Sequence, residues 1–111
     1  MIGLKRPPGV AENFMDKRKT LKKKFEIRNK LGLHARPAAL FVQTANRFKS
    51  DIEVVKGRQK VNGKSIMGIM TLAAGMGVAI TVQVTGEDAE LALTEISALI
   101  EGNFGEEEVI R

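Results

Sequence analysis

The chain has 111 residues, of which 43% are hydrophobic, and this is enough to fill the core of one modest domain. It contains no cysteine, so disulfide frameworks and cysteine-based zinc or iron-sulfur sites are excluded, and a reducing compartment fits best. The net charge is +5, but residues 1–24 alone carry +6, which describes a basic tail on a near-neutral domain and argues against a nucleic-acid surface spread over the fold.

The beginning of the chain predicts a flexible arm in front of a single domain. Residues 1–20 contain the Pro7-Pro8-Gly9 breaker and a charge cluster without apolar periodicity, so we expect an arm over 1–20 and a domain over 21–111. The arm lacks the apolar middle of a secretory signal, and no apolar stretch approaches the roughly 20 residues of a membrane span. We therefore expect a cytoplasmic protein without a membrane span.

The first half of the domain predicts a strand, a helix and a hairpin. Apolar and polar residues alternate over 21–28, which predicts a strand with one buried face, interrupted by Lys23. Apolar residues then recur at helical spacing over 37–48, which predicts a helix that ends near residue 48. Residues 51–54 and 58–61 alternate again and predict an antiparallel hairpin.

A second, short helix is expected after this hairpin. Ser65 belongs to a residue type that favours the N-cap position, and it stands before an apolar run over 66–74. Gly75 and Gly77 follow the run and are expected to stop the helix.

The last part of the domain carries the strongest periodic patterns. Residues 78–84 alternate with period two and predict a strand, while residues 89–100 form an apolar helical stripe closed by Gly102. The order is therefore β-α-β-β-α-β-α. Because the strands alternate, each needs one covered and one wet face, which predicts an α+β fold with a four-stranded, mainly antiparallel sheet and three helices on one face.

The segment LGLHARPAAL places the only histidine, His34, immediately before the first predicted helix. Pro37 suits the first helical turn, where its missing N–H costs nothing, so it indicates where the helix begins. The first amides of a helix lack intrahelical partners and lie at the positive end of the helix dipole, so a phosphate on the ring would be stabilised there. Arg36 can bind the same oxygens.

These positive neighbours disfavour the imidazolium, which predicts an uncharged ring with one nitrogen free to attack phosphorus. If the donor protein supplies the leaving group and the positioning, the site needs no metal, cofactor or general base of its own. The chain would then be a phosphocarrier and not an enzyme. The alternative, in which His34 only caps or packs the loop, stays open, whereas a catalytic triad or a metal site has little support in the sequence.

The short helix after Ser65 is apolar almost all round, so not all of its side chains can be buried. Ile69 and Leu72 are expected to face the core. Ile66, Met67 and Met70 are expected to remain exposed, where flexible apolar side chains suit a surface that docks several partners in turn.

Two segments, LGLHARPAAL around His34 and KVNGKSIMGIM around Ser65, closely resemble HPr, the histidine-containing phosphocarrier family of the bacterial phosphoenolpyruvate:sugar phosphotransferase system. The likeness covers essentially residues 21–111, and the predicted element order matches the open-faced β-sandwich of that family. The resemblance implies a cytoplasmic monomer without cofactor or metal that takes part in sugar transport and carbon catabolite regulation.

The resemblance also implies a role for each site residue. His34 would accept the phosphoryl group from enzyme I at Nδ1, the pros nitrogen, and donate it to the sugar-specific enzyme II A domains. Arg36 would bind the phosphate. Ser65 would be the regulatory serine that an HPr kinase/phosphorylase modifies, which would link the chain to a transcriptional regulator. The partner-docking patch would consist of Ile66, Met67 and Met70.

Three other hypotheses are compatible with the sequence. The nearest is a paralogue that serves a regulatory, nitrogen-related branch with the same histidine chemistry, although the segment 65–68 favours the sugar branch. An interaction-only regulator is a second reading, but such relatives tend to lose the histidine, and His34 is present. A nucleic-acid binder would show steep salt dependence that disappears when residues 1–20 are removed.

Overall fold

The computed structural model describes residues 19–106, and the predicted order of strands and helices is confirmed. A short 3₁₀ turn, η1, follows the last helix and was not predicted. The elements are β1 (Lys19–Glu26), α1 (Ala35–Ala45), β2 (Asp51–Lys56), β3 (Gln59–Asn62), α2 (Ile66–Thr71), β4 (Ala79–Gly86), α3 (Ala89–Glu101) and η1 (Asn103–Gly105). No helix among residues 19–106 is long and apolar enough to cross a membrane.

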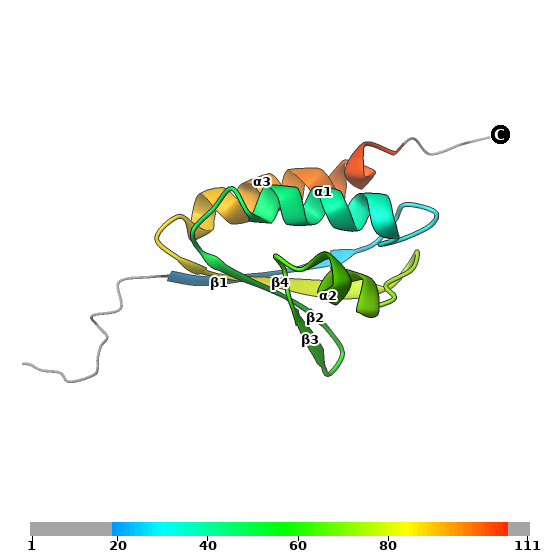
Figure 1. The fold of residues 1–111 in the computed structure, drawn as a ribbon, viewed down its shortest axis with the longest axis horizontal. Coiled ribbons are helices and arrows are strands. Elements are labelled where there is room, and N and C mark those ends of the chain that lie inside the picture. Colours follow the sequence, from blue (N-terminus) through cyan, green and yellow to red (C-terminus); the bar gives the residue numbers. More distant parts are fainter. Residues whose placement is uncertain (1–18, 107–111) are drawn as a thin grey trace, which may run out of the picture.

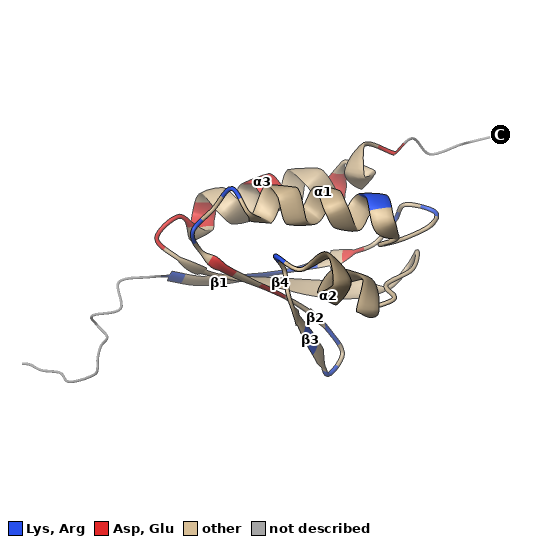
Figure 2. Cartoon of the chain, viewed as in Figure 1, with Lys and Arg blue, Asp and Glu red and all other residues tan. Residues whose placement is uncertain are grey.

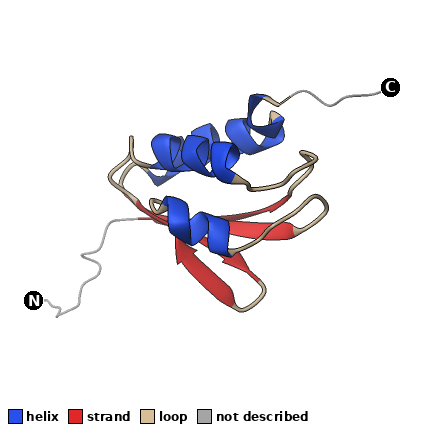
Figure 3. Cartoon of the chain, turned by 45° about the vertical axis from the view of Figure 1, so that its right-hand side comes forward, coloured by secondary structure: helices blue, strands red, loops and turns tan. Residues whose placement is uncertain are grey.

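The four strands form one sheet in the order β1-β4-β2-β3, and each neighbouring pair is antiparallel. Helices α1 and α3 run side by side over this sheet (Figure 1). All three helices lie on the same side of the strands, so the other face is left uncovered (Figure 3). The open-faced β-sandwich predicted from the sequence is therefore the observed fold.

The buried face of the sheet follows from the period-two pattern of its central strand. In β4 the residues Ile80, Val82 and Val84 are at most 1% exposed, while the two residues between them are partly exposed. These residues pack against apolar side chains of α1 and α3, including Phe41 and Ile96, which are both completely buried. Fully burying one such side chain contributes about 1.5–3 kcal/mol, so this layer is a substantial source of stability.

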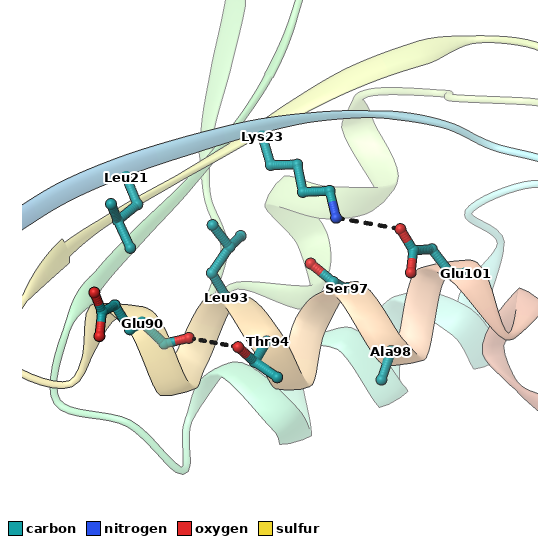
Figure 4. A pocket seen from close by; sticks show the side chains of 8 residues that line it. All are labelled: Leu21, Lys23, Glu90, Leu93, Thr94, Ser97, Ala98 and Glu101. Atoms are coloured by element: carbon teal, nitrogen blue, oxygen red, sulfur yellow. Dashed lines mark hydrogen bonds and ion pairs between the residues drawn. The ribbon is translucent and has the colours of Figure 1, made fainter.

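Lys23 interrupts the buried row of β1, as the sequence predicted. Its ammonium lies 3.3 Å from Glu101 Oε2 and 5.2 Å from the centre of the Phe25 ring. Figure 4 shows the Lys23 side chain reaching from β1 to α3 along an open groove of about 650 Å³. The long lysine stem covers apolar surface at the edge of the sandwich while its charge stays in water.

The first helix differs from its prediction at both ends. It begins at Ala35 and not at Pro37, because the amide of Ala38 already donates to the carbonyl of His34, 3.0 Å away. It ends at Ala45 and not near Phe48. The amides of Arg47 and Phe48 then reach back only three residues, so the chain tightens into a turn.

The second helix is shorter than the predicted run over 66–74. It ends at Thr71, because the amides of Leu72 and Ala73 bond to carbonyls three residues earlier, and Ala73 then adopts a φ of 50°. The chain thus leaves the helix before it reaches Gly75, the residue that the sequence predicts as the stop.

The first strand begins at Lys19, two residues earlier than the alternation suggested, because Lys19 and Thr20 pair with residues 86 and 85 of β4. The rest of the predicted basic arm, residues 1–18, lies outside the described residues, as do residues 107–111 at the other end. Within the described part, the basic positions of β1 lie beneath acidic positions of α3 (Figure 2).

Asp88, the N-cap of α3, ties that helix to the turn before β2, and this contact predicts a loss of stability in acid. The pKa of the Asp88 carboxyl lies below its usual value. The main cause is the hydrogen bond from the Ser50 hydroxyl, and the second is the hydrogen bond from the Lys49 amide. A lowered folded-state pKa stabilises the fold above the unfolded value of about 3.9, and this contribution is lost as the pH falls through the folded pKa. Urea unfolding from about pH 7 to about pH 3 should therefore show a smaller acid loss for Asp88→Asn than for the parent chain.

The matched control for this experiment is Glu87→Gln, which removes an exposed carboxylate next to Asp88. This variant should keep the full acid loss of the parent chain. An equal acid loss in the parent chain and in Asp88→Asn would contradict the assignment.

Candidate functional site

His34 occupies the N-cap position of α1. Its backbone is extended, with φ −79° and ψ −170°, and its carbonyl accepts the first helical hydrogen bond from Ala38. The imidazole forms no capping bond to the helix, and its side chain is 35% exposed. The ring therefore stands at the opening of α1, partly in solvent, where another protein can reach it.

The opening of α1 is positively polarised and holds no acidic residue in its first turn. Pro37 occupies the third helical position, so it removes one of the four amide donors that a helix start normally leaves free. The amides of Ala35 and Arg36 remain as first-turn donors. The Arg36 side chain is exposed and forms no ion pair with any residue of the range 19–106, so its guanidinium is available to an anion.

The loop that carries His34 is fixed by close backbone packing at Gly32. This glycine has a φ of +66°, and a Cβ placed on it would lie 2.4 Å from the carbonyl oxygen of Ala74. The neighbouring amide of Leu33 donates to the same oxygen across 2.9 Å, and the Leu33 side chain is buried. The segment before α1 therefore lies directly on the segment that follows α2, which joins the histidine to the surface of α2.

The sequence reading missed one contact of the ring, a hydrogen bond to the carboxylate of Glu106. His34 Nε2 lies 3.0 Å from Glu106 Oε2, and Asn29 Nδ2 donates to Glu106 Oε1 across 3.0 Å. The sequence predicted only positive neighbours for His34, so Glu106 adds a negative one. The sequence contains one weak indication of this contact. Phe104 is a lone apolar residue between glycines after α3, which is typical of an anchored turn.

The exposed and buried faces of α2 agree with the sequence prediction. Ser65 is the N-cap, and its Oγ accepts from the Gly68 amide across 3.0 Å. Ile69 and Leu72 are completely buried in the core. The three expected surface residues are exposed by 42%, 74% and 40%, in the order Ile66, Met67 and Met70.

Two further large apolar side chains are exposed on the loops that meet beside Gly32. Leu31 is 70% exposed before α1, and Met76 is 63% exposed after α2. Within residues 19–106, no cluster of three or more histidine or acidic side chains could hold a metal ion.

Comparison with known proteins gives one consistent family. Residues 21–102 match the family model described as the PTS HPr component phosphorylation site. The phosphocarrier protein HPr of Neisseria meningitidis serogroup A is 51% identical over 88 residues, which cover 79% of this chain and 99% of that protein.

Solved structures with similar folds come from the same family. HPr of Thermoanaerobacter tengcongensis is 52% identical, with a TM-score of 0.77 over 79% of this chain and 99% of that one. The catabolite repression protein Crh of Bacillus subtilis, described as a swapped dimer, is 51% identical, with a TM-score of 0.61 over 73% and 93%. The chain therefore belongs to the HPr family, the phosphocarriers of the phosphotransferase system.

Proposed function

We propose that His34 is the residue that carries the phosphoryl group, accepting it at Nδ1 from enzyme I and donating it to sugar-specific enzyme II A domains. The observation that carries this proposal is the position of a half-buried imidazole at the opening of α1, beside first-turn amides and the Arg36 guanidinium, which pairs with no residue of the range 19–106. Incubation with phosphoenolpyruvate and enzyme I, followed by intact mass measurement, tests it. A chain that stays unlabelled would refute it.

The chemistry needs little from the carrier itself. The Nδ1 lone pair forms the bond to phosphorus, the bond to the leaving group of the donor breaks, and its electrons remain with that group. Transfer between two proteins is then mainly a matter of positioning and of stabilising the phosphoryl oxygens. First-turn amides and Arg36 suit that task, so the chain acts as a covalent intermediate with no catalytic group of its own.

Partner docking is assigned to the exposed apolar side chains of α2. Gly32 brings the His34 loop against the chain that leaves α2, so a partner that covers α2 also reaches the ring. Methionine side chains adapt to surfaces of different shape, which suits successive binding of enzyme I and the II A domains. The assignment would fail if Met67→Asp left the transfer rate with both partners unchanged.

Replacing Arg36 with alanine is expected to slow phosphoryl transfer by about 10- to 100-fold, the scale of one lost hydrogen bond to a charged group. The fold should be unaffected, since the Arg36 side chain is exposed. The measurement is the rate of labelling by enzyme I. Arg47→Ala is the matched control, because Arg47 pairs with Glu95 near the other end of α1 and should transfer at the parental rate. Equal rates for both variants would remove Arg36 from the site.

Ser65 is proposed as a regulatory phosphorylation site for an HPr kinase/phosphorylase, and through it for a transcriptional regulator. A phosphate there adds about −1.5 to −2 charge beside the docking surface, which repels an acidic partner face. The similarity to Crh, described as a catabolite repression protein, supports a regulatory role of this kind. Treatment with such a kinase and ATP should label the parent chain but not Ser65→Ala, and labelling of both would refute the site.

The segment Ser65 to Gly68 favours the sugar branch over the nitrogen-related paralogue. We further propose that the carrier acts as a monomer in the cytoplasm. Sedimentation of the full chain tests the monomer, and a stable dimer of the kind described for Crh would contradict it.

A further inference from the structure

The strongest feature that the proposed transfer leaves unused is the chain of contacts from Asn29 through Glu106 to His34. Asn29 is 2% exposed, and its Nδ2 donates both to the Gly32 carbonyl across 2.8 Å and to Glu106 Oε1 across 3.0 Å. The second carboxylate oxygen, Oε2, then lies 3.0 Å from His34 Nε2. One buried amide therefore fixes a carboxylate, and that carboxylate fixes the ring.

The orientation of the Asn29 amide is dictated by its neighbours. Both the Gly32 carbonyl and the Glu106 carboxylate are acceptors, so only Nδ2 can face them. Asn29 Oδ1 is consequently buried, and no described residue donates to it. An unsatisfied buried oxygen costs about 1–3 kcal/mol. The Asn29 amide holds the Glu106 carboxylate in spite of this cost. We take this as an indication that the carboxylate has a role.

The segment that delivers Glu106 is itself held in an unfavourable conformation. Asn103 and Phe104 both have a φ of 56°, a region that non-glycine residues rarely adopt. The Phe104 side chain is 2% exposed, and its burial offsets the strain. The amide of Glu106 donates to the Asn103 carbonyl across 2.9 Å, which closes the turn. The core thus anchors the turn, and the turn places the Glu106 carboxylate at the ring.

A carboxylate only accepts hydrogen bonds, so His34 Nε2 must carry the proton. In an uncharged ring this leaves Nδ1 with the free lone pair. As Nδ1 bonds to phosphorus, positive charge develops on the ring while the proton stays on Nε2, and a carboxylate at Nε2 stabilises that charge. In Ser-His-Asp enzymes an acid residue orients a histidine and stabilises its imidazolium in the same way, and it contributes strongly to catalysis.

We propose that Glu106, held by Asn29, is a positioning residue that keeps the His34 proton on Nε2 and stabilises the ring as Nδ1 takes up the phosphoryl group. The inference rests on the proposed transfer at His34 and adds the group that prepares the ring for it. No proton leaves the ring during the step. The Nδ1–P bond forms, the bond from phosphorus to the donor breaks, and its electrons go to the donor.

The first test is the ring itself and needs no donor protein. Long-range proton–nitrogen NMR of the ¹⁵N-labelled chain should show a protonated Nε2 and a bare Nδ1 in the neutral ring of the parent chain. In Glu106→Gln the nitrogen shifts should move towards a mixture of the two tautomers, while Glu95→Gln, which removes a carboxylate of α3 paired with Arg47, should keep the parental spectrum. Identical ring spectra for all three chains would overturn the inference.

The second test is the rate of labelling by enzyme I. Glu106→Gln should be slower by about tenfold or more, the scale of one charge-assisted hydrogen bond, and Glu106→Asp should recover part of the rate. In a double-mutant cycle, Asn29→Ala should add little to Glu106→Gln, because Asn29 acts through the carboxylate. If the parent chain is labelled and Glu106→Gln is labelled at the same rate, the proposed role of Glu106 is rejected while transfer at His34 stands. If the parent chain is not labelled, the proposed transfer itself is rejected.

Discussion

His34→Ala should accept no phosphoryl group from enzyme I while keeping the fold of the parent chain. The loss is complete because His34 is the only histidine in the sequence, so no second imidazole can replace it. The fold should persist because the side chain is 35% exposed and bonds to a partly exposed carboxylate that water can solvate. We expect the free energy of unfolding to change by about 0.5 kcal/mol or less, as is usual at surface positions.

Intact mass after incubation with phosphoenolpyruvate and enzyme I reads out the first part of this prediction, and urea unfolding reads out the second. His34→Gln is a useful companion, because it keeps a side chain of similar polarity at the same place. Labelling that persists in either variant would move the phosphoryl group to another residue. An unfolded His34→Ala chain would instead assign the ring a structural role.

Gly32→Ala should both destabilise the fold and slow phosphoryl transfer. The new methyl group would lie 2.4 Å from the Ala74 carbonyl oxygen and 2.6 Å from the Gly75 Cα, and both are backbone atoms that cannot swing away. The positive φ costs an alanine about 1–2 kcal/mol. The overlap adds about 1–3 kcal/mol if the two segments move apart. That movement would shift the His34 loop from the chain that leaves α2, so docking and transfer should both weaken.

The β2–β3 turn provides the matched control for this substitution. Gly57 has a similar φ of +59°, but nothing lies within 4 Å of a Cβ placed on it. Gly57→Ala should therefore show the conformational cost alone, about 1–2 kcal/mol, with an unchanged transfer rate. If urea unfolding and the transfer rate respond equally to the two alanines, the close packing at Gly32 is not what positions His34.

The sequence predicted the fold well because its main signals are local and repeat within one element. The alternation of β4 and the stripe of α3 both match the observed burial, with Val82 and Ile96 completely buried. The exposed and buried sides of α2 could also be separated by spacing alone. Helix ends were predicted less well, because bonds to carbonyls three residues earlier close α1 and α2 before the breaking residues are reached.

The site was predicted in part for the same reason. His34, Arg36 and Pro37 lie within four consecutive positions, so their association could be read directly from the sequence. Glu106 lies 72 residues from His34, and the two meet because α3 runs back along α1 towards the start of that helix (Figure 1). No periodic pattern encodes such a contact. The buried Phe104 gives the only local hint that the end of the domain is anchored.

His34 Nδ1 is the atom proposed to carry the phosphoryl group between two proteins. ³¹P and ¹⁵N NMR of the full chain, after incubation with phosphoenolpyruvate and enzyme I, measures this directly. We predict one acid-labile phosphoryl group per chain, bonded to Nδ1, that disappears when a II A domain is added. A phosphoryl group on Nε2 or on a hydroxyl, or one that the II A domain does not remove, would contradict the account.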